Sequence, residues 1–186
     1  MSTSIYDAAY HNKFLERSKT DLGKQIYKAR WDLVMRHAPG HLRLLDYGCA
    51  SGAFHMGSPN GYRTHGYDVN PHTGFSSGKD LGYMAFDIVT MWDSIEHVHD
   101  PVDVIKGLMP DWLFITTPNL ESVKTGIKEW KHYRPGEHLY YFDRHSLKEV
   151  LGSCNYEIVE ENFIEGALRD PSDPEAIITV AARLRK

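Results

Sequence analysis

Two acidic residues and a glycine-containing turn near residue 50 have the types and spacing of a nucleoside-binding site. Asp46 ends a short apolar stretch, and the following residues, 48–52, are mostly small, so the backbone there can approach a ligand closely before a helix begins. The unpaired N–H groups at that helix start suit an anionic group, and Asp68, which ends the next predicted strand, suits the two hydroxyls of a ribose. A dinucleotide site prefers G-x-G-x-x-G, whereas this chain has D-x-G-x-A-x-G with the acid inside the motif. The pattern therefore predicts a nucleoside site other than an NAD site.

Together with three later segments, this pattern resembles the class I S-adenosylmethionine-dependent methyltransferases. The later segments are residues 86–98 followed by Asp100-Pro101, residues 117–119 and residues 137–142. They occur in the order and spacing of that family and cover almost the whole chain. Within the family they look most like the small-molecule branch that contains the ubiquinone-biosynthesis O-methyltransferases.

The resemblance implies S-adenosylmethionine as the cofactor, and the expected binding residues lie in the turn, at Asp68 and after the central strand. Asp46 would orient the turn and the methionyl amine, and Asp68 would bind the ribose. Each also has a purely structural alternative: Asp46 could be a strand-end cap and Asp68 a solvated strand terminus. Trp92 could equally be a core residue, and Asp80 could be a solvated turn residue. The predicted cofactor-binding residues are Asp46, Gly48, Cys49, Ala50, Gly52, Asp68, Val69, Asp80, Met91, Trp92 and Asp93.

His138 and His97 are the candidate catalytic residues. In the family, the segment that matches 130–142 covers the acceptor pocket. Its aromatic residues are therefore expected to form a substrate wall, and His138 is expected to act as the base. The alternative is that the segment is an ordinary packed connection. His97 is the second candidate base, with a locally hydrogen-bonded structural role as the alternative. His97 and His99 lie two residues apart, a spacing that matches no strong zinc signature, so no metal site is predicted. Tyr6 and Tyr10 could close the site from the N-terminal side.

Composition restricts the possible partners. The formal net charge is −4 with a pI near 6.2, which gives no general attraction to nucleic acid, although Lys124, Lys128 and Lys131 form a local basic run. The sequence contains no apolar stretch long enough to cross a membrane, and residues 1–10 lack the apolar core of a signal peptide. We therefore expect a cytoplasmic protein with no membrane partner, whose two cysteines, Cys49 and Cys154, are free thiols.

The alternation of predicted helices and strands indicates an α/β fold. We expect a Rossmann-like, doubly wound and mostly parallel sheet with helices on both faces and a C-terminal antiparallel hairpin. Residues 1–186 would form a single domain, with 1–40 as an N-terminal helical cover and 41–186 as the core. Helix starts are predicted at Thr20, Asp100 and Asp143. Strands are predicted over 42–46, 63–68, 86–92, 112–116, 156–163 and 176–184.

Two segments are expected to be irregular. Between Asp68 and Phe86 there is too little chain for a full helix-and-strand crossover, so the third strand region is shortened, and with it the adenine pocket. Residues 165–174 are expected to be a polar loop.

These observations predict methyl transfer from S-adenosylmethionine to a small-molecule acceptor, with oxygen as the expected acceptor atom. Two alternatives remain: a non-catalytic binding module on the same fold, favoured by Ala50 and the shortened adenine region, and a methyltransferase that acts on RNA or protein. A contiguous basic face would be needed for RNA, which the net charge does not favour. The oligomeric state is left open.

Overall fold

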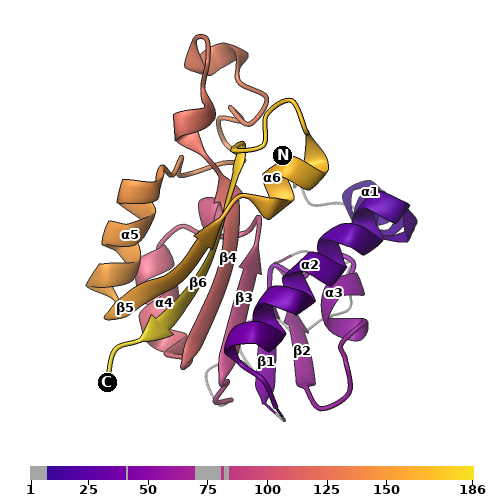
Figure 1. The fold of residues 1–186 in the computed structure, drawn as a ribbon, viewed down its shortest axis with the longest axis vertical. Helices are drawn as coiled ribbons and strands as arrows, with labels where there is room; N and C mark the ends of the chain where they lie inside the picture. Colours follow the sequence, from indigo (N-terminus) through magenta and orange to yellow (C-terminus); the bar gives the residue numbers. More distant parts are fainter. Residues whose placement is uncertain (1–7, 41, 70–80, 82–83) are drawn as a thin grey trace.

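The computed structural model describes residues 8–40, 42–69, 81 and 84–186, and this part of the chain contains one mixed sheet in the order β2-β1-β3-β4-β6-β5 (Figure 1). Strands β1, β2, β3 and β4 pair in parallel, whereas β6 lies antiparallel between β4 and β5. The predicted α/β Rossmann-like class and its C-terminal antiparallel hairpin are therefore confirmed. The strands are β1 (Arg43–Tyr47), β2 (Arg63–Tyr67), β3 (Ile88–Trp92), β4 (Trp112–Pro118), β5 (Tyr156–Asn162) and β6 (Ile177–Leu184).

Helices cover both faces of the sheet, as predicted. On one face, Trp31 and Val34 of α2 pack against Leu44 and Phe114. On the other face, α4 and α5 bury their apolar residues against a separate cluster that includes Met91. The helices are α1 (Ala8–Lys19), α2 (Asp21–His37), α3 (Ala53–Met56), α4 (Pro101–Leu108), α5 (Arg144–Ser153) and α6 (Ile164–Arg169), with 3-10 turns η3 (Ile95–His97), η4 (Leu120–Ser122) and η5 (Ile127–Glu129).

The three predicted helix starts are confirmed by their side-chain caps. Thr20 Oγ1 accepts a hydrogen bond from the Gly23 N–H at 3.0 Å. The carboxylates of Asp100 and Asp143 do the same for α4 and α5, at 2.9 and 2.6 Å. Each cap satisfies a backbone N–H that has no partner inside its helix, which contributes about 1 kcal/mol.

The expectation of a polar loop over 165–174 was wrong for residues 165–169, which belong to helix α6, whereas residues 170–174 form turns as expected. Glu165 is 1% exposed, and its carboxylate is paired with Arg30 of α2. The next residue, Gly166, lies so close to the Pro174 carbonyl that a Cβ atom there would overlap it. A buried ion pair and a tight backbone approach thus stabilise a helix in a sequence whose polar composition favoured a loop.

The predicted shortening of the third strand region lies largely outside the described residues. Of the stretch between Asp68 and Phe86, only residues 69, 81 and 84–85 are described, and these contain no strand. Asp80, the predicted adenine-side acid, also lies outside the described residues, as does Tyr6. Among the helices that the structure describes, none is long and apolar enough to span a membrane. The side chains of Cys49 and Cys154 are both buried free thiols.

The turn after β1 is fastened to the end of β2. Gly48 and Cys49 donate their N–H groups to the Tyr67 carbonyl at 2.8 and 3.0 Å. Gly48 has a φ of +80°, in the left-handed region that favours glycine. A Cβ atom at this position would overlap the Ser94 side chain. Glycine is therefore required at residue 48 by the protein itself, before any ligand is considered.

We predict that Gly48→Ala lowers the free energy of unfolding by about 2–5 kcal/mol, since the left-handed backbone costs an L-residue roughly 1–2 kcal/mol and overpacking adds roughly 1–3 kcal/mol. Urea denaturation followed by circular dichroism measures this change. Gly152→Ala is the matched control, because residue 152 lies in α5 with open space around its Cβ position. That variant should gain about 0.5–1 kcal/mol. Equal stability of the Gly48 variant and the wild type would contradict the prediction.

Candidate active site

A cavity of about 600 Å³ lies where the carboxyl ends of β1, β2 and β3 meet. This edge is where open parallel sheets bind ligands, and the volume is that of a typical small-molecule site. Helices α1, α2 and α6 contribute Tyr10, Arg30 and Arg169 to its wall. Ten of the predicted site residues line this one cavity. They are Asp46, Gly48, Cys49, Ala50, Asp68, Val69, Trp92, Asp93, His97 and His138.

Asp68 is hydrogen-bonded to the glycine-containing turn after β1, beside which it was predicted to lie. Its Oδ2 accepts a hydrogen bond from the Ala50 N–H at 2.7 Å. Ala50 has a φ of +46°, the left-handed conformation in which its methyl group is unfavourable compared with glycine. Beyond Asp68, Val69 is 65% exposed at the rim of the cavity. One carboxylate therefore both fixes the turn and faces the ligand space.

Asp46 is 2% exposed and is oriented by two neighbours. Its Oδ1 accepts a hydrogen bond from the Thr90 hydroxyl at 2.8 Å, and its Oδ2 lies 3.4 Å from His55 Nδ1. The contact with Thr90 ties the end of β1 to the adjacent strand β3. Asp46 thus joins two strands through its side chain and still borders the cavity.

Cys49 is a buried thiol beside the two acids. Burial raises its pKa well above the usual range, and the charges of Asp46 and Asp68 raise it further. Only the thiolate is a strong nucleophile, so Cys49 is an unreactive wall residue.

Two predicted cofactor residues do not reach the cavity. Met91 is fully buried on the sheet face that α4 and α5 cover, because successive strand side chains point to opposite faces and its neighbour Trp92 points to the other one. Gly52 caps the start of α3 with a φ of +75° and is not part of the cavity wall. We therefore correct both: Met91 is a core residue, and Gly52 shapes the turn from behind.

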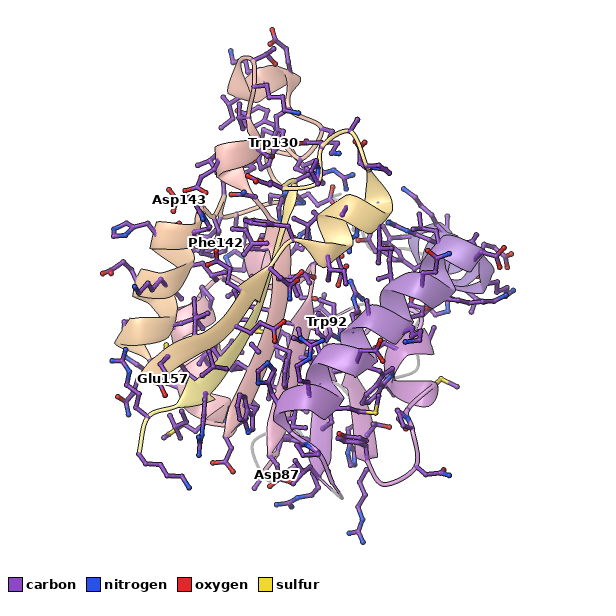
Figure 2. The ribbon with its side chains drawn as sticks, viewed as in Figure 1. Asp87, Trp92, Trp130, Phe142, Asp143 and Glu157 are labelled. Carbon is purple, nitrogen blue, oxygen red and sulfur yellow. The ribbon has the colours of Figure 1, made fainter. Side chains whose placement is uncertain are left out.

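Trp92 combines the two roles that the sequence left open. It is 6% exposed and packs with α2 residues in the core, and Figure 2 shows it beside that helix. Its ring meets Phe54 edge-on at 5.4 Å, and the Arg30 guanidinium lies 4.9 Å from the ring centre. The same side chain also lines the cavity. It is a core residue whose inner edge forms part of the wall.

Asp93 lies in a network of four charged side chains that the sequence did not reveal. Arg30 donates to both carboxylate oxygens of Glu165, at 2.7 and 3.0 Å. Arg169 donates to Asp93 at 3.1 and 2.5 Å and also to Glu165, while Arg30 reaches Asp93 at 3.3 Å. Burial alone would raise the pKa of Asp93, but the charges of Arg169 and Arg30 outweigh it and hold that pKa well below its usual range. The network joins α2, the end of β3 and α6 beside the cavity.

His97 and His138 come together from distant parts of the chain, and the buried side chain of Glu96 lies next to both. The two imidazoles meet edge-on at 4.7 Å. Burial, followed by the charge of His97, lowers the pKa of His138 to about 4, so its ring is neutral at physiological pH and a weaker base than predicted. Burial and the negative charge of Asp93 raise the pKa of Glu96 to about 8. Glu96 lies within the segment 86–98 that carries the family resemblance, but nothing in the sequence showed that it would lie next to His138.

The segment 130–142 borders the cavity through its polar residues instead of its rings. Trp130, Tyr133 and Tyr141 pack against one another, at ring distances of 6.1 and 5.7 Å. Lining residues from this segment are Lys131, His132, Arg134, Glu137 and His138. The expected aromatic substrate wall was therefore wrong: the rings build the segment, and its polar groups face the cavity.

A family model described as "Methyltransferase domain" matches residues 10–161. No sequence among the curated proteins matches the chain significantly.

Solved structures with the same fold include magnesium protoporphyrin IX methyltransferase (ChlM) from Synechocystis PCC 6803 with bound SAH. Its TM-score is 0.67, and the two chains are 14% identical over 97% of this chain and 96% of that one. A SAM-dependent methyltransferase from Archaeoglobus fulgidus has a TM-score of 0.64 and 19% identity, over 92% of this chain and 99% of that one. The [4+2]-cyclase SpnF has a TM-score of 0.61 and 17% identity, over 90% and 83% of the two chains. At these identities the similarities show the fold alone.

We predict that Glu165→Gln lowers the free energy of unfolding by about 3–5 kcal/mol, because it removes one of the two negative charges that balance Arg30 and Arg169 and leaves Asp93 alone to pair with both. Replacing both members, as Arg30→Met with Glu165→Leu, should cost less than the sum of the two single changes. The exposed pair Lys28–Asp32 is the control, and Asp32→Ala should change stability by at most about 0.5 kcal/mol. Chemical denaturation measures all of these values. Additive single and double losses would show that the pair is not coupled.

Proposed function

The chain belongs to the class I S-adenosylmethionine-dependent methyltransferase family, and from this premise we propose that it methylates an oxygen atom of a small-molecule acceptor. We assign this activity to residues 1–186 as one domain and place the protein in the small-molecule branch of the family. The proposal depends on one observation. A single cavity is lined both by the residues suited to the cofactor and by two imidazoles suited to a hydroxyl acceptor.

The residues around the turn fit the polar groups of S-adenosylmethionine. Asp46 is a buried, oriented carboxylate, which suits an ammonium group. Asp68 ends β2 beside the turn and suits ribose hydroxyls, since a carboxylate accepts several hydrogen bonds in addition to the one from Ala50. Tyr47 and Tyr67 supply ring faces on the same wall, with centroids 4.7 Å apart. When bound, S-adenosylmethionine supplies a methyl group activated by its sulfonium sulfur.

We assign the acceptor hydroxyl to the surroundings of His97 and His138. Both imidazoles line the cavity, and burial excludes bulk water from His138, which is 6% exposed. The His97 Nδ1–H is held by the Glu137 carbonyl at 2.8 Å, which fixes the ring orientation. Because the cofactor provides the reactive group, the main task of these residues is to hold the acceptor oxygen in line with the methyl group.

The pairing of the basic residues argues against RNA as the acceptor. Lys124 and Lys131 lie 3.3 and 3.0 Å from Asp173 and Asp170. Arg134 is paired with Glu137 at 3.2 Å. Phosphate binding needs positive charge that local acids do not neutralise. Local acids therefore pair with two of the three lysines of the basic run, Lys124 and Lys131, which weakens it as a surface for nucleic acid.

We predict that Asp68→Ala weakens binding of S-adenosylhomocysteine by about 1.5–3 kcal/mol, because a charged acceptor of hydrogen bonds is lost. Titration calorimetry measures the affinity, with an unchanged circular dichroism spectrum as the check on folding. Asp103→Ala is the matched control, since Asp103 is another carboxylate on the cavity wall but lies on α4. If the two variants lose equal cofactor affinity, the effect of Asp68 comes from its negative charge in general, and the ribose role is contradicted.

We predict that His138→Ala lowers the rate of methyl transfer by about a hundredfold or more while cofactor affinity stays unchanged. The assay follows labelled methyl groups from S-adenosylmethionine into a panel of phenols, alcohols, carboxylic acids and amines. His145→Ala, an exposed histidine on α5, should keep the wild-type rate. Products methylated only at nitrogen would contradict the oxygen acceptor. Full activity of the His138 variant would contradict its role.

A further inference from the structure

We propose that Glu96, His97 and His138 bind one divalent transition-metal cation beside the acceptor. The catalytic role of this cation rests on the function proposed above, whereas its binding does not. One possible ligand atom from each of the three side chains lies within 4.8 Å of the other two. All three side chains also line the cavity that contains the cofactor residues. The site would thus place a cation within the space where acceptor and cofactor meet.

Backbone hydrogen bonds bring the three side chains together. Glu96 and His97 are neighbours in η3, just after β3. His138 lies 41 residues beyond His97 in the sequence, but the N–H groups of Leu139 and Tyr140 both donate to the Glu96 carbonyl, at 2.8 and 3.2 Å. The chain next to His138 is therefore fixed directly to the chain that carries the other two side chains.

Two polar atoms of these side chains are buried and make no hydrogen bond of standard geometry in the part of the chain that the structure describes, although the Thr117 hydroxyl lies near Glu96 and the His132 backbone near His138. They are Glu96 Oε2 and His138 Nδ1. The two side chains are only 2% and 6% exposed. A buried polar atom left unpaired costs roughly 1–3 kcal/mol, and more when it is charged, so native proteins nearly always satisfy such atoms. A single cation between them would satisfy both atoms at once.

The orientation of His97 matches that of a metal-binding imidazole. Its Nδ1 lies 2.8 Å from the Glu137 carbonyl. A carbonyl only accepts, so Nδ1 carries the hydrogen and Nε2 has the lone pair. Nε2 lies 4.0 Å from the nearer oxygen of the Glu96 carboxylate, Oε1, which is too far for a hydrogen bond and leaves Nε2 facing the side chain that would share the cation. A ring held through one nitrogen by a carbonyl, with the other nitrogen on the metal, is the usual arrangement in metal sites.

The set of ligand atoms selects the kind of cation. Two imidazole nitrogens and one carboxylate oxygen suit Zn²⁺, Mn²⁺, Fe²⁺ or Co²⁺, whereas Ca²⁺ and Mg²⁺ prefer oxygen alone. Bonds of about 2.1 Å hold two ligand atoms at most about 4.2 Å apart, so binding has to draw together atoms that now lie up to 4.8 Å apart. Asp93 is not a ligand, because Arg30 and Arg169 occupy its carboxylate. Three protein ligands leave coordination positions for an acceptor oxygen.

Such a cation would prepare the acceptor for methyl transfer. A hydroxyl bound to a divalent cation has a lowered pKa and releases its proton to water more readily. A lone pair of the resulting oxygen then forms the bond to the methyl carbon, while the S–C bond breaks and its electron pair stays on sulfur. The products are the methyl ether, S-adenosylhomocysteine and a proton, so no oxidant or reductant is needed. His138 would then act as a metal ligand instead of the base.

The test measures cation binding by the full chain after chelator treatment, without any acceptor. Titration calorimetry with Mn²⁺ or Zn²⁺ should give one site per chain. Co²⁺ should give an absorption spectrum of nitrogen and oxygen ligation without a thiolate band. Glu96→Gln, His97→Asn and His138→Asn should each weaken binding by about tenfold or more. The exposed His145 is the matched control, and His145→Asn should bind the cation like the wild type.

Three results would overturn the cation site: no saturable binding at one cation per chain, equal affinity in the His138 and His145 variants, or a Co²⁺ spectrum with a thiolate band. If Glu96→Gln does not fold, the two histidine variants decide the question. S-adenosylhomocysteine binding is titrated in the same samples. Intact cofactor binding without a cation would overturn this inference and leave the proposed function standing. A bound cation without methyl transfer to any hydroxyl acceptor would overturn the proposed acceptor and support the site.

Discussion

The structure around the cavity depends on one ionic network, which is buried at Arg30 and Glu165 and partly exposed at Asp93 and Arg169. Arg30, Asp93, Glu165 and Arg169 balance two positive charges with two negative ones, and they come from α2, the end of β3 and α6. Burying any of these charges alone would cost several kcal/mol, so each holds the others in place. The position of α2 above the sheet, the conformation of the chain after β3 and the presence of α6 are therefore coupled. These three elements form much of the wall, so the shape of the cavity follows from charge balance as well as from apolar packing.

The features that the sequence predicted are those controlled by neighbouring residues. Thr20, Asp100 and Asp143 cap helices because a side-chain oxygen can reach an N–H group three residues away. The strands were recognisable from short apolar runs, and the parallel arrangement follows from alternating helices and strands. Asp46 and Asp68 end adjacent parallel strands, so topology alone placed them at the same edge of the sheet. For this reason most of the predicted cofactor residues meet in one cavity.

The features that the sequence missed depend on contacts between distant residues. Glu165 looked like a loop residue because its partner Arg30 is 135 positions away, and no local pattern reports that pair. Glu96 and His138 meet only because backbone bonds join η3 to the segment after residue 138. Met91 is different. Strand alternation places it on the face opposite Thr90 and Trp92, so closer attention to the period of two would have assigned it to the core.

The distribution of charge inside the cavity indicates how an acceptor can be selected. Arg30, Asp93 and Arg169 line the wall but already neutralise one another, and Lys131 and Arg134 are paired with nearby acids. A ligand gains little from groups whose hydrogen bonds it would have to break. The buried ligand atoms of Glu96 and His138 differ, because they make no hydrogen bond of standard geometry among the described residues. Selectivity should therefore come from the shape of the cavity, from this cluster and from Arg17, which also lines the wall, with the surrounding ion pairs acting as a rigid frame.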